Sequence, residues 1–232
     1  MADPTIVDRD TWLIARQNLL AAEKQFTRER DRLNASRRAL PAVLVDKPYR
    51  FSTERGEQTL TGLFGDNSQL LIYHFMFGKT WQEGCPSCSF WADSFNGSSV
   101  HLAARDTAFF CVSSAPLTRL LAYRARMGWQ FDWASSGDSD FNADFGVTFA
   151  GNEPGPTNGY NYGSSGFGEE MPGISAFSRL ADGSVVHTYS AYSRGLDMIN
   201  GTYHLLDLTA SGRDEAALPF TQAWVRRHDQ YD

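Results

Sequence analysis

Cysteine is scarce in this sequence: its 232 residues include three, and two of them are close together. So few cysteines cannot supply the dense disulfide framework of a small secreted domain. In a reducing compartment, a close pair of cysteines is more often catalytic or metal-binding than structural. The pair formed by Cys85 and Cys88 is therefore the first candidate for a functional site.

The sequence also lacks an excess of positive charge and long apolar runs. Its 21 Lys and Arg against 27 Asp and Glu give a formal net charge of −6, which argues against nucleic acid or an anionic membrane as the main partner. No apolar run is long enough to cross a bilayer. The polar start, Met-Ala-Asp-Pro-Thr, lacks the basic and apolar regions of a signal peptide. We therefore expect a soluble, cytoplasmic protein that binds neither nucleic acid nor membrane.

Hydrophobic residues make up 42% of the chain, enough for a sizeable core. Residues 1–42 are predicted to be a helical extension and residues 43–232 one larger domain. Asp8 or Asp10 can cap a helix over residues 8–38, which Pro41 ends. Its apolar residues recur at roughly helical spacing: Trp12, Leu13, Leu19, Leu20, Phe26 and Leu33. We interpret its polar face, rich in Arg and Glu, as the solvated side of a helix that packs or forms a homodimer; a basic partner-binding face is the alternative.

The larger domain shows the patterns of an α/β fold. The apolar run at residues 70–77 is typical of a strand buried on both faces. Further strands are expected at residues 49–51, 59–60, 108–113, 129–133, 174–178 and 184–189, and helices at 85–95, 101–105, 116–127, 138–146 and 195–206. Ala181-Asp182-Gly183 joins the last two strands as a hairpin. This order predicts a mixed sheet with helices on both faces.

Residues 150–170 have the Gly- and Asn-rich composition of a loop. A loop of this length in a compact domain is often functional or mobile. Its aromatic stretch, Tyr160-Asn161-Tyr162, is a candidate lid or partner surface, and a tolerated insertion is the alternative.

The cysteine pair is predicted to lie where the loop after the buried strand meets the start of a helix. The first N–H groups of a helix have no internal partner and its dipole is positive there, so both favour a thiolate at Cys85. Cys88 follows one turn later on the same face, within reach of a disulfide. Pro86 suits the first turn of the helix, and the Ser87 hydroxyl can hydrogen-bond a thiolate.

This placement predicts dithiol chemistry, in which Cys85 attacks a disulfide and Cys88 resolves the mixed disulfide. Half of a zinc site is an alternative, but the sequence contains no second C-x-x-C or C/H pair at zinc-finger spacing. An inert, degenerate pair is the other alternative. We therefore expect neither a metal nor a cofactor.

Four residues outside the motif are predicted to support the site. Trp81 could shape a substrate-facing rim. Glu83, which we prefer to Asp93, could raise the pKa of Cys85 by like-charge repulsion or shuttle protons to the resolving thiol. Met171 and Pro172 precede a strand, where the proline is either cis or an ordinary first residue of the strand.

Two further residues have chemistry-bearing side chains but are predicted to belong to the core. His74, on the strand that leads to the cysteines, is expected to be a hydrogen-bonded core histidine rather than a base. Cys111, among apolar neighbours on a strand, is expected to be a small buried hydrophobe.

The stretch from Tyr73 to Asp93, which contains the motif Gly84-Cys85-Pro86-Ser87-Cys88, resembles a bacterial family of unknown function usually described as predicted dithiol-disulfide oxidoreductases. The resemblance continues through residues 101–106, 126–129, 140–146, 187–197 and 224–229, nearly the whole chain. It implies a thioredoxin-like fold and dithiol-disulfide chemistry. The motif differs from the Trp-Cys-Gly-Pro-Cys of thioredoxins.

Three functions are open at this point. The first is a thiol-disulfide oxidoreductase that acts on a protein or small-molecule disulfide. The second is a thioredoxin-fold binding module with a structural or vestigial cysteine pair. The third, a peroxiredoxin-like peroxidase, is disfavoured because Gln82 stands three residues before Cys85, where peroxiredoxins carry Thr or Ser.

Overall fold

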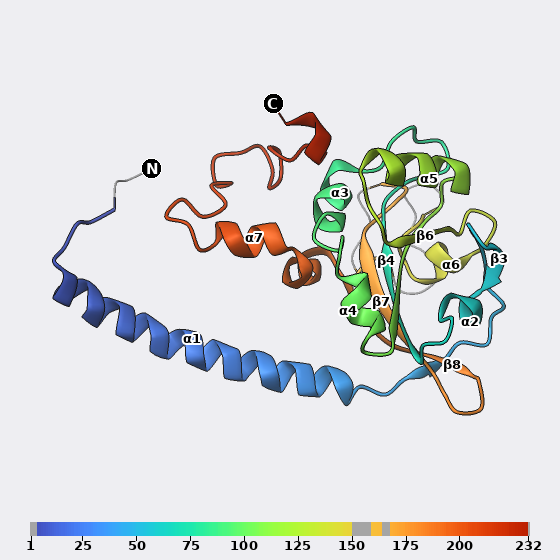
Figure 1. Ribbon diagram of the computed structural model, residues 1–232, viewed down its shortest axis with the longest axis horizontal. Coiled ribbons are helices and arrows are strands. Elements are labelled where there is room, and N and C mark those ends of the chain that lie inside the picture. The colour runs from blue at the N-terminus through green and yellow to red at the C-terminus, as the bar shows by residue number, and fades with distance from the viewer. Residues whose placement is uncertain (1–3, 150–158, 164–167, 232) are drawn as a thin grey trace.

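One sheet of eight strands, covered by helices on both faces, forms the body of the molecule (Figure 1). The computed structural model describes residues 4–149, 159–163 and 168–231. The strands are β1 (Val43–Leu44), β2 (Arg50–Thr53), β3 (Gly56–Thr59), β4 (Gln69–His74), β5 (Thr107–Ser113), β6 (Asp132–Ser135), β7 (Gly173–Arg179) and β8 (Val185–Tyr192). The helices are α1 (Arg9–Arg38), α2 (Leu60–Leu63), α3 (Pro86–Ala92), α4 (Ser99–Ala103), α5 (Leu117–Arg126), α6 (Phe141–Asp144) and α7 (Gly201–Leu206), with 3₁₀ turns η1 (Ser193–Ile199) and η2 (His228–Gln230).

The centre of the sheet is parallel and its flanks are antiparallel. β4 pairs in parallel with β5, and β5 with β6, whereas β7 runs antiparallel to β4 and to β8. The strand order is β1-β8-β7-β4-β5-β6-β2-β3. α3 connects β4 to β5, α5 follows β5, and β7, β8 and α7 come later in the chain. The four neighbouring strands β8-β7-β4-β5 with these connections form a thioredoxin-like core, so the predicted fold class is confirmed.

Alternation along β4 divides the core into two layers. Tyr73 packs on one face of the sheet with Phe90 of α3 and Leu120 of α5. Leu70 and Ile72 pack on the other face with the residues of α2 and α6. A strand that buries both faces needs apolar residues at nearly every position, which explains the continuous apolar run in the sequence.

Two predicted elements differ from the structure because a single side chain caps a helix. Thr59 ends β3 and accepts a 3.2 Å hydrogen bond from Gly62 N, so Leu60 begins α2 instead of continuing a strand. The single helix expected over residues 195–206 is split into η1 and α7. Asn200 separates them, since its side chain accepts a 2.9 Å hydrogen bond from Tyr203 N. Both contacts are helix caps that hydrophobic periodicity does not reveal.

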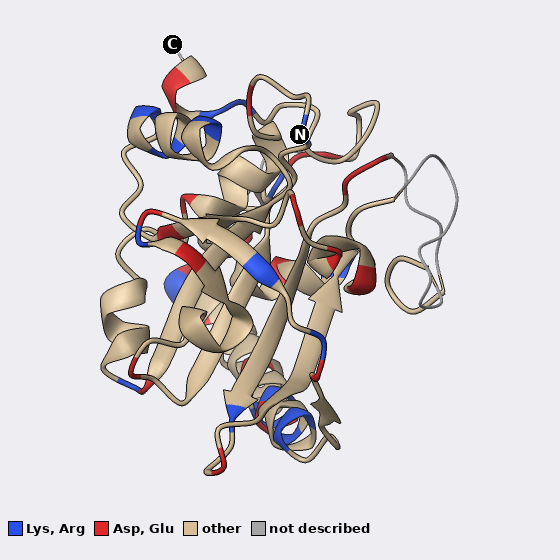
Figure 2. Ribbon diagram, turned by 90° about the vertical axis from the view of Figure 1, so that its right-hand side faces the viewer, with Lys and Arg blue, Asp and Glu red and all other residues tan. Residues whose placement is uncertain are grey.

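Acidic and basic residues are interspersed along the ribbon of the sheet domain (Figure 2). Among the described residues, no helix is both long and apolar enough to span a membrane.

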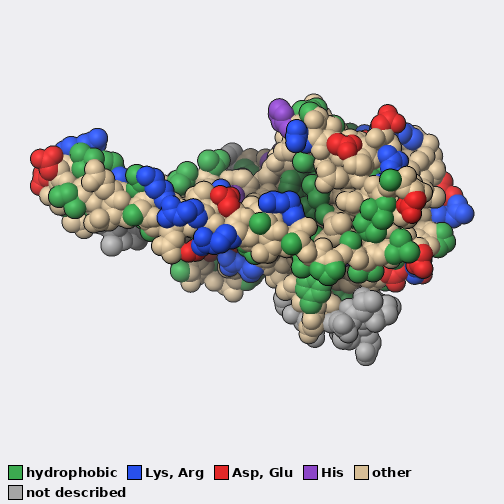
Figure 3. Space-filling model, turned by 90° about the horizontal axis from the view of Figure 1, so that it is seen from below, with side chains coloured by type: hydrophobic (Ala, Val, Ile, Leu, Met, Phe, Trp, Pro, Cys, Tyr) green, Lys and Arg blue, Asp and Glu red, His purple; other side chains and the backbone are tan. Residues whose placement is uncertain are grey.

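Helix α1 extends away from the sheet domain and buries none of its residues (Figure 3). The carboxylate of Asp8 caps it by accepting a 2.8 Å hydrogen bond from Thr11 N, which agrees with the predicted start of the helix. Large apolar side chains stay exposed along it, including Phe26 at 65% and Ile14 at 64%. A helix of this kind gains little stability from its own domain, because most helical stability in proteins comes from tertiary packing.

Candidate functional site

The cysteine pair lies at the start of α3, in the connection from β4 to β5. Cys85 is the residue that precedes the helix, and Pro86 occupies its first turn. The backbone N–H of Cys85 donates a 3.1 Å hydrogen bond to the carbonyl of Met76, which closes the loop after β4. The loop therefore presents the first cysteine at the helix start.

Cys85 is partly exposed, and its surroundings favour the thiolate. The pKa of its thiol is lowered to about 6, chiefly by a hydrogen bond from the Cys88 thiol. The backbone N–H groups of Cys88 and Ser87 and the Ser87 hydroxyl also hydrogen-bond the sulfur and lower its pKa, whereas burial acts in the opposite direction. These donors are free at the start of a helix to bind a thiolate.

Cys88 has the opposite character. Its side chain is 2% exposed, and burial together with the neighbouring Cys85 raises the pKa of its thiol well above the ordinary value. Met76 N donates a 3.5 Å hydrogen bond to its sulfur, and the Tyr73 hydroxyl hydrogen-bonds the same atom. The pair thus combines an accessible thiolate with a buried thiol that keeps its proton.

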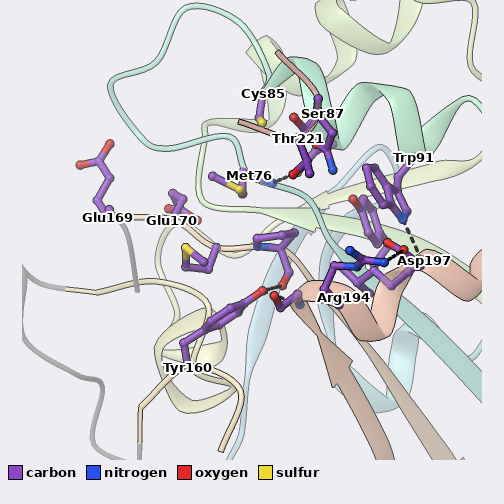
Figure 4. A pocket seen from close by; sticks show the side chains of 18 of the residues that line it. Met76, Cys85, Ser87, Trp91, Tyr160, Glu169, Glu170, Arg194, Asp197 and Thr221 are labelled. Atoms are coloured by element: carbon purple, nitrogen blue, oxygen red, sulfur yellow. Dashed lines mark hydrogen bonds and ion pairs between the residues drawn. The ribbon is translucent and has the colours of Figure 1, made fainter. Parts of the chain in front are cut away.

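Both cysteines line a cavity of about 490 Å³. Its apolar walls include Met76 and Leu196 and two indole rings, those of Trp81 and Trp91. Figure 4 shows Cys85 and Ser87 at one end, and Glu169 and Glu170 on the side opposite Arg194 and Asp197. A concave, mostly apolar cavity with a few polar groups is the usual form of a small-molecule site.

Most of the residues predicted to support the cysteines line this cavity. Trp81, Ser87, Met171 and Pro172 are all part of its wall, and Pro86 begins α3. The peptide bond before Pro172 is trans, so Pro172 is an ordinary proline at the start of a strand and not a cis-proline.

Glu83 lies in a different environment. Its carboxylate forms ion pairs with Arg126 and with Arg227, the latter at 3.0 Å, and it does not line the cavity. Asp93 accepts hydrogen bonds of 2.7 Å from Trp129 Nε1 and from His228 Nδ1. Neither carboxylate is among the main causes of the shift in the pKa of Cys85.

Sequence reasoning overlooked Glu170, a buried carboxylic acid in the cavity wall. It is 4% exposed, and its Oε2 accepts a 3.0 Å hydrogen bond from Thr148 Oγ1. Burial raises its pKa to about 7, against the lowering effect of hydrogen bonds from the Ser114 and Thr148 hydroxyls. A carboxyl with a shifted pKa inside a cavity is a functional candidate. The only signal in the sequence was an acidic pair directly before Met171-Pro172.

The aromatic residues of the predicted lid are divided between the interior and the surface. Tyr160 is 2% exposed and lines the cavity; its hydroxyl donates to the Pro172 carbonyl at 2.8 Å and accepts from Ser193 N at 2.7 Å. Tyr162 is 70% exposed. Residues 150–158 and 164–167 of the predicted loop lie outside the described residues.

His74 and Cys111 are core residues, as expected. His74 is 1% exposed, hydrogen-bonds Ser175 Oγ at 2.8 Å, and has its pKa lowered to about 3 by burial. Cys111 is fully buried on β5, and burial raises the pKa of its thiol. Within the described part of the chain, no group of three or more His, Cys, Asp or Glu side chains is arranged to hold a metal ion.

The last residues of the described chain hold the loop before Cys85 in place. Arg227 donates hydrogen bonds of 2.7 and 3.2 Å to the carbonyl of Gly84 and one of 3.0 Å to the Tyr123 hydroxyl. The Tyr123 hydroxyl in turn lies 2.8 Å from Ser89 Oγ, on α3. These contacts tie α3, α5 and the C-terminal segment together next to the first cysteine.

Gly84 has no room for a side chain, and Gly84→Ala is expected to lower the free energy of unfolding by about 1–3 kcal/mol. A Cβ would lie 2.6 Å from the Phe75 ring and 2.9 Å from the Tyr123 ring. Urea titration followed by circular dichroism measures the loss. Gly168→Ala is the control, since nothing lies within 4 Å of its Cβ position. Equal stability of the two variants would contradict the tight packing at Gly84.

The fold and the site together define a thioredoxin-fold protein with a cysteine pair at the start of the helix that follows its central strand. The chain belongs to the family described as bacterial protein of unknown function (DUF899), whose model matches residues 1–231. No curated protein matches the chain in sequence.

Several solved structures are similar in fold to this chain. One is a cysteine-to-serine mutant of peroxiredoxin Q from Xanthomonas campestris, with 18% identity, a TM-score of 0.49, and coverage of 72% of this chain and 97% of that one. Another is peroxidoxin BcpB from Mycobacterium tuberculosis, with 14% identity, a TM-score of 0.47, and coverage of 69% and 96%. A proposed thiol:disulfide interchange protein DsbE from Chlorobium tepidum has 12% identity, a TM-score of 0.41, and coverage of 69% and 93%. These likenesses say nothing about activity.

Proposed function

We propose that this protein is a thiol-disulfide oxidoreductase that uses Cys85 as the attacking thiolate and Cys88 as the resolving thiol. The observation that carries the proposal is the asymmetry of the pair. Cys85 has a lowered pKa and lines a cavity, whereas Cys88, one helical turn further on, is buried and protonated. Attack needs a thiolate at the surface, and resolution needs a second thiol within reach of the first.

The reaction consists of two exchanges. Cys85 S⁻ attacks one sulfur of a substrate disulfide, which forms a mixed disulfide and releases the first thiolate. Cys88 then loses its proton to solvent and attacks the Cys85 sulfur, which forms the Cys85–Cys88 disulfide and releases the second thiolate. The substrate gains two electrons and the protein loses two, so repeated turnover needs a dithiol reductant that reduces the protein again.

Alkylation of Cys85 as a function of pH tests the attacking thiolate. Only the thiolate reacts, so the alkylation rate is expected to rise as the pH increases through about 6 and to level off above it. In Cys88→Ala, the donor with the largest effect is lost, and the midpoint is expected to move upwards. The two proteins are compared by the pH midpoint of alkylation and not by the rate at one pH. A thiolate with a higher pKa is more nucleophilic, which partly offsets the smaller fraction of thiolate at a given pH.

The same protein is then equilibrated in glutathione redox buffers, and the Cys85–Cys88 disulfide is measured by mass spectrometry. A reversible disulfide is expected. An alkylation midpoint above about 8.5, the value of a free cysteine, together with no disulfide at any buffer ratio, would favour the binding module with a vestigial pair. Consumption of hydrogen peroxide without disulfide exchange would favour the peroxidase.

A further inference from the structure

The cavity that holds the cysteine pair has the size of a small-molecule site. Its volume of about 490 Å³ lies within the roughly 300–1,000 Å³ range of ligand pockets. Trp81 and Glu169 border it on one side, and Thr221 and Gln222 of the C-terminal segment border it on another. A small disulfide can approach Cys85 within this hollow.

The charge of the lining favours a cation. Three carboxylates, those of Glu169, Glu170 and Asp197, line the cavity together with one guanidinium, that of Arg194. Asp197 forms ion pairs with Arg194 at 2.8 Å and with Arg213 at 3.0 Å. Glu169 and Glu170, on the opposite side of the cavity (Figure 4), take part in none of the ion pairs of the described residues. Glu169 is exposed and accepts a hydrogen bond from Trp81 Nε1.

Glu170 is the buried member of this acidic side, and its protein partners are neutral. The hydroxyls of Thr148 and Ser114 hydrogen-bond it, and none of the ion pairs in the described part of the chain includes it. The main charge effects on it come from Glu169, which raises its pKa, and from Lys79, which has a smaller lowering effect. A buried carboxylate without a cationic partner is costly, and a bound ammonium group would remove that cost.

We infer that the cavity takes low-molecular-weight disulfides that carry a protonated amine, and that Glu170 receives the ammonium group. This inference rests on the proposed function, because it assigns a substrate class to the same cysteine pair. The amine of one arm binds the carboxylate, and Cys85 attacks a sulfur of the disulfide. The two exchanges described above then release two aminothiols and leave the Cys85–Cys88 disulfide.

Three disulfides of similar size and different charge test the inference. The reduced protein is mixed at pH 8 with cystamine, which carries two amines, with the neutral bis(2-hydroxyethyl) disulfide, or with the anionic dithiodiglycolate. Single-turnover formation of the Cys85–Cys88 disulfide is followed by mass spectrometry, and each rate is divided by the rate of free dithiothreitol with the same disulfide. This normalisation removes differences in intrinsic reactivity, and no added reductant is needed.

We expect cystamine to react about tenfold faster than the neutral disulfide after normalisation, and the anionic one to be slowest. A charge-assisted hydrogen bond between the ammonium group and Glu170 accounts for a preference of this size. In Glu170→Gln the ratio of the cystamine rate to the neutral rate is expected to fall close to one. Glu57→Gln, an equal change of charge on the exposed β2–β3 hairpin, is expected to keep the ratio of the wild type.

Competition experiments on the wild-type protein test the ammonium site without relying on the folding of a variant. Hexane-1,6-diamine has the length of cystamine but no disulfide, and it is expected to slow both the reaction with the neutral disulfide and the alkylation of Cys85. Hexane-1,6-diol is expected to have no effect. Protection by both compounds alike, or by neither, would overturn the role of the ammonium group.

The outcomes separate the substrate class from the proposed function. Equal normalised rates for the three disulfides, or faster oxidation by a protein disulfide such as that of insulin, would refute the aminothiol class and leave the dithiol function standing. No oxidation of the cysteine pair by any disulfide would refute the proposed function itself.

Discussion

Cys85→Ser is expected to reduce thiol-disulfide exchange to the rate of the uncatalysed reaction. The substitution keeps the size of the side chain and the hydrogen bonds at the start of α3, but a serine hydroxyl is not ionised at neutral pH and does not attack disulfide sulfur. Cys88 cannot replace the lost thiolate, because it is 2% exposed and its pKa is raised by burial. The release of thiol from a chromogenic disulfide measures the loss.

Cys88→Ser is expected to behave differently, because it removes only the second exchange. The first attack still occurs, so half of the substrate stays attached to Cys85, and the mass of the protein increases by that half. Cys111→Ala is the control, since this third cysteine is fully buried on β5 and does not line the cavity. Exchange that persists in Cys85→Ser, or a trapped adduct on Cys111, would refute the assignment of the two roles.

Trp133→Ala is expected to have the largest effect on stability, with a loss of about 3–5 kcal/mol in the free energy of unfolding. Trp133 lies on β6 and is 1% exposed. The centroid of its ring lies 4.7 Å from that of Phe75 and 5.8 Å from that of Trp129. Its Nε1 donates a 3.1 Å hydrogen bond to Ser113 Oγ. Its removal would leave a cavity among aromatic side chains that cannot collapse freely.

Urea unfolding followed by circular dichroism measures this effect. Phe220→Ala removes a large aromatic side chain that is 67% exposed, and its effect is expected to stay within about 0.5 kcal/mol. A loss below about 1 kcal/mol for Trp133→Ala would mean that the aromatic cluster is not tightly packed.

The position of the cysteine pair could be predicted because its determinants are local. The apolar run before Cys85 and the helical pattern after it set the strand, the loop and the start of the helix. The environments of Glu83 and Glu170 could not be predicted in the same way. Glu83 pairs with Arg126 and Arg227, which are distant in the chain, and Glu170 is buried against hydroxyls from other segments.

The break within the helix predicted over residues 195–206 could not be predicted from the apolar pattern either. The apolar residues at 195–206 continue at helical spacing, yet the side chain of Asn200 caps a new helix in the middle of them. Asn favours such positions because its side chain competes for backbone hydrogen bonds. Burial patterns report which face of an element is covered, whereas caps depend on the geometry of one side chain.

The contact between Arg227 and Gly84 also has a consequence for synthesis on the ribosome. The two residues are 143 positions apart, so at a translation rate of about 5–20 residues per second Arg227 is made roughly 7 to 30 s after Gly84. During that interval the nascent chain carries Cys85 without the guanidinium that fixes the preceding loop. Cys85 is therefore present in the nascent chain before its final surroundings exist, and these contacts are completed only after nearly the whole described chain has been translated.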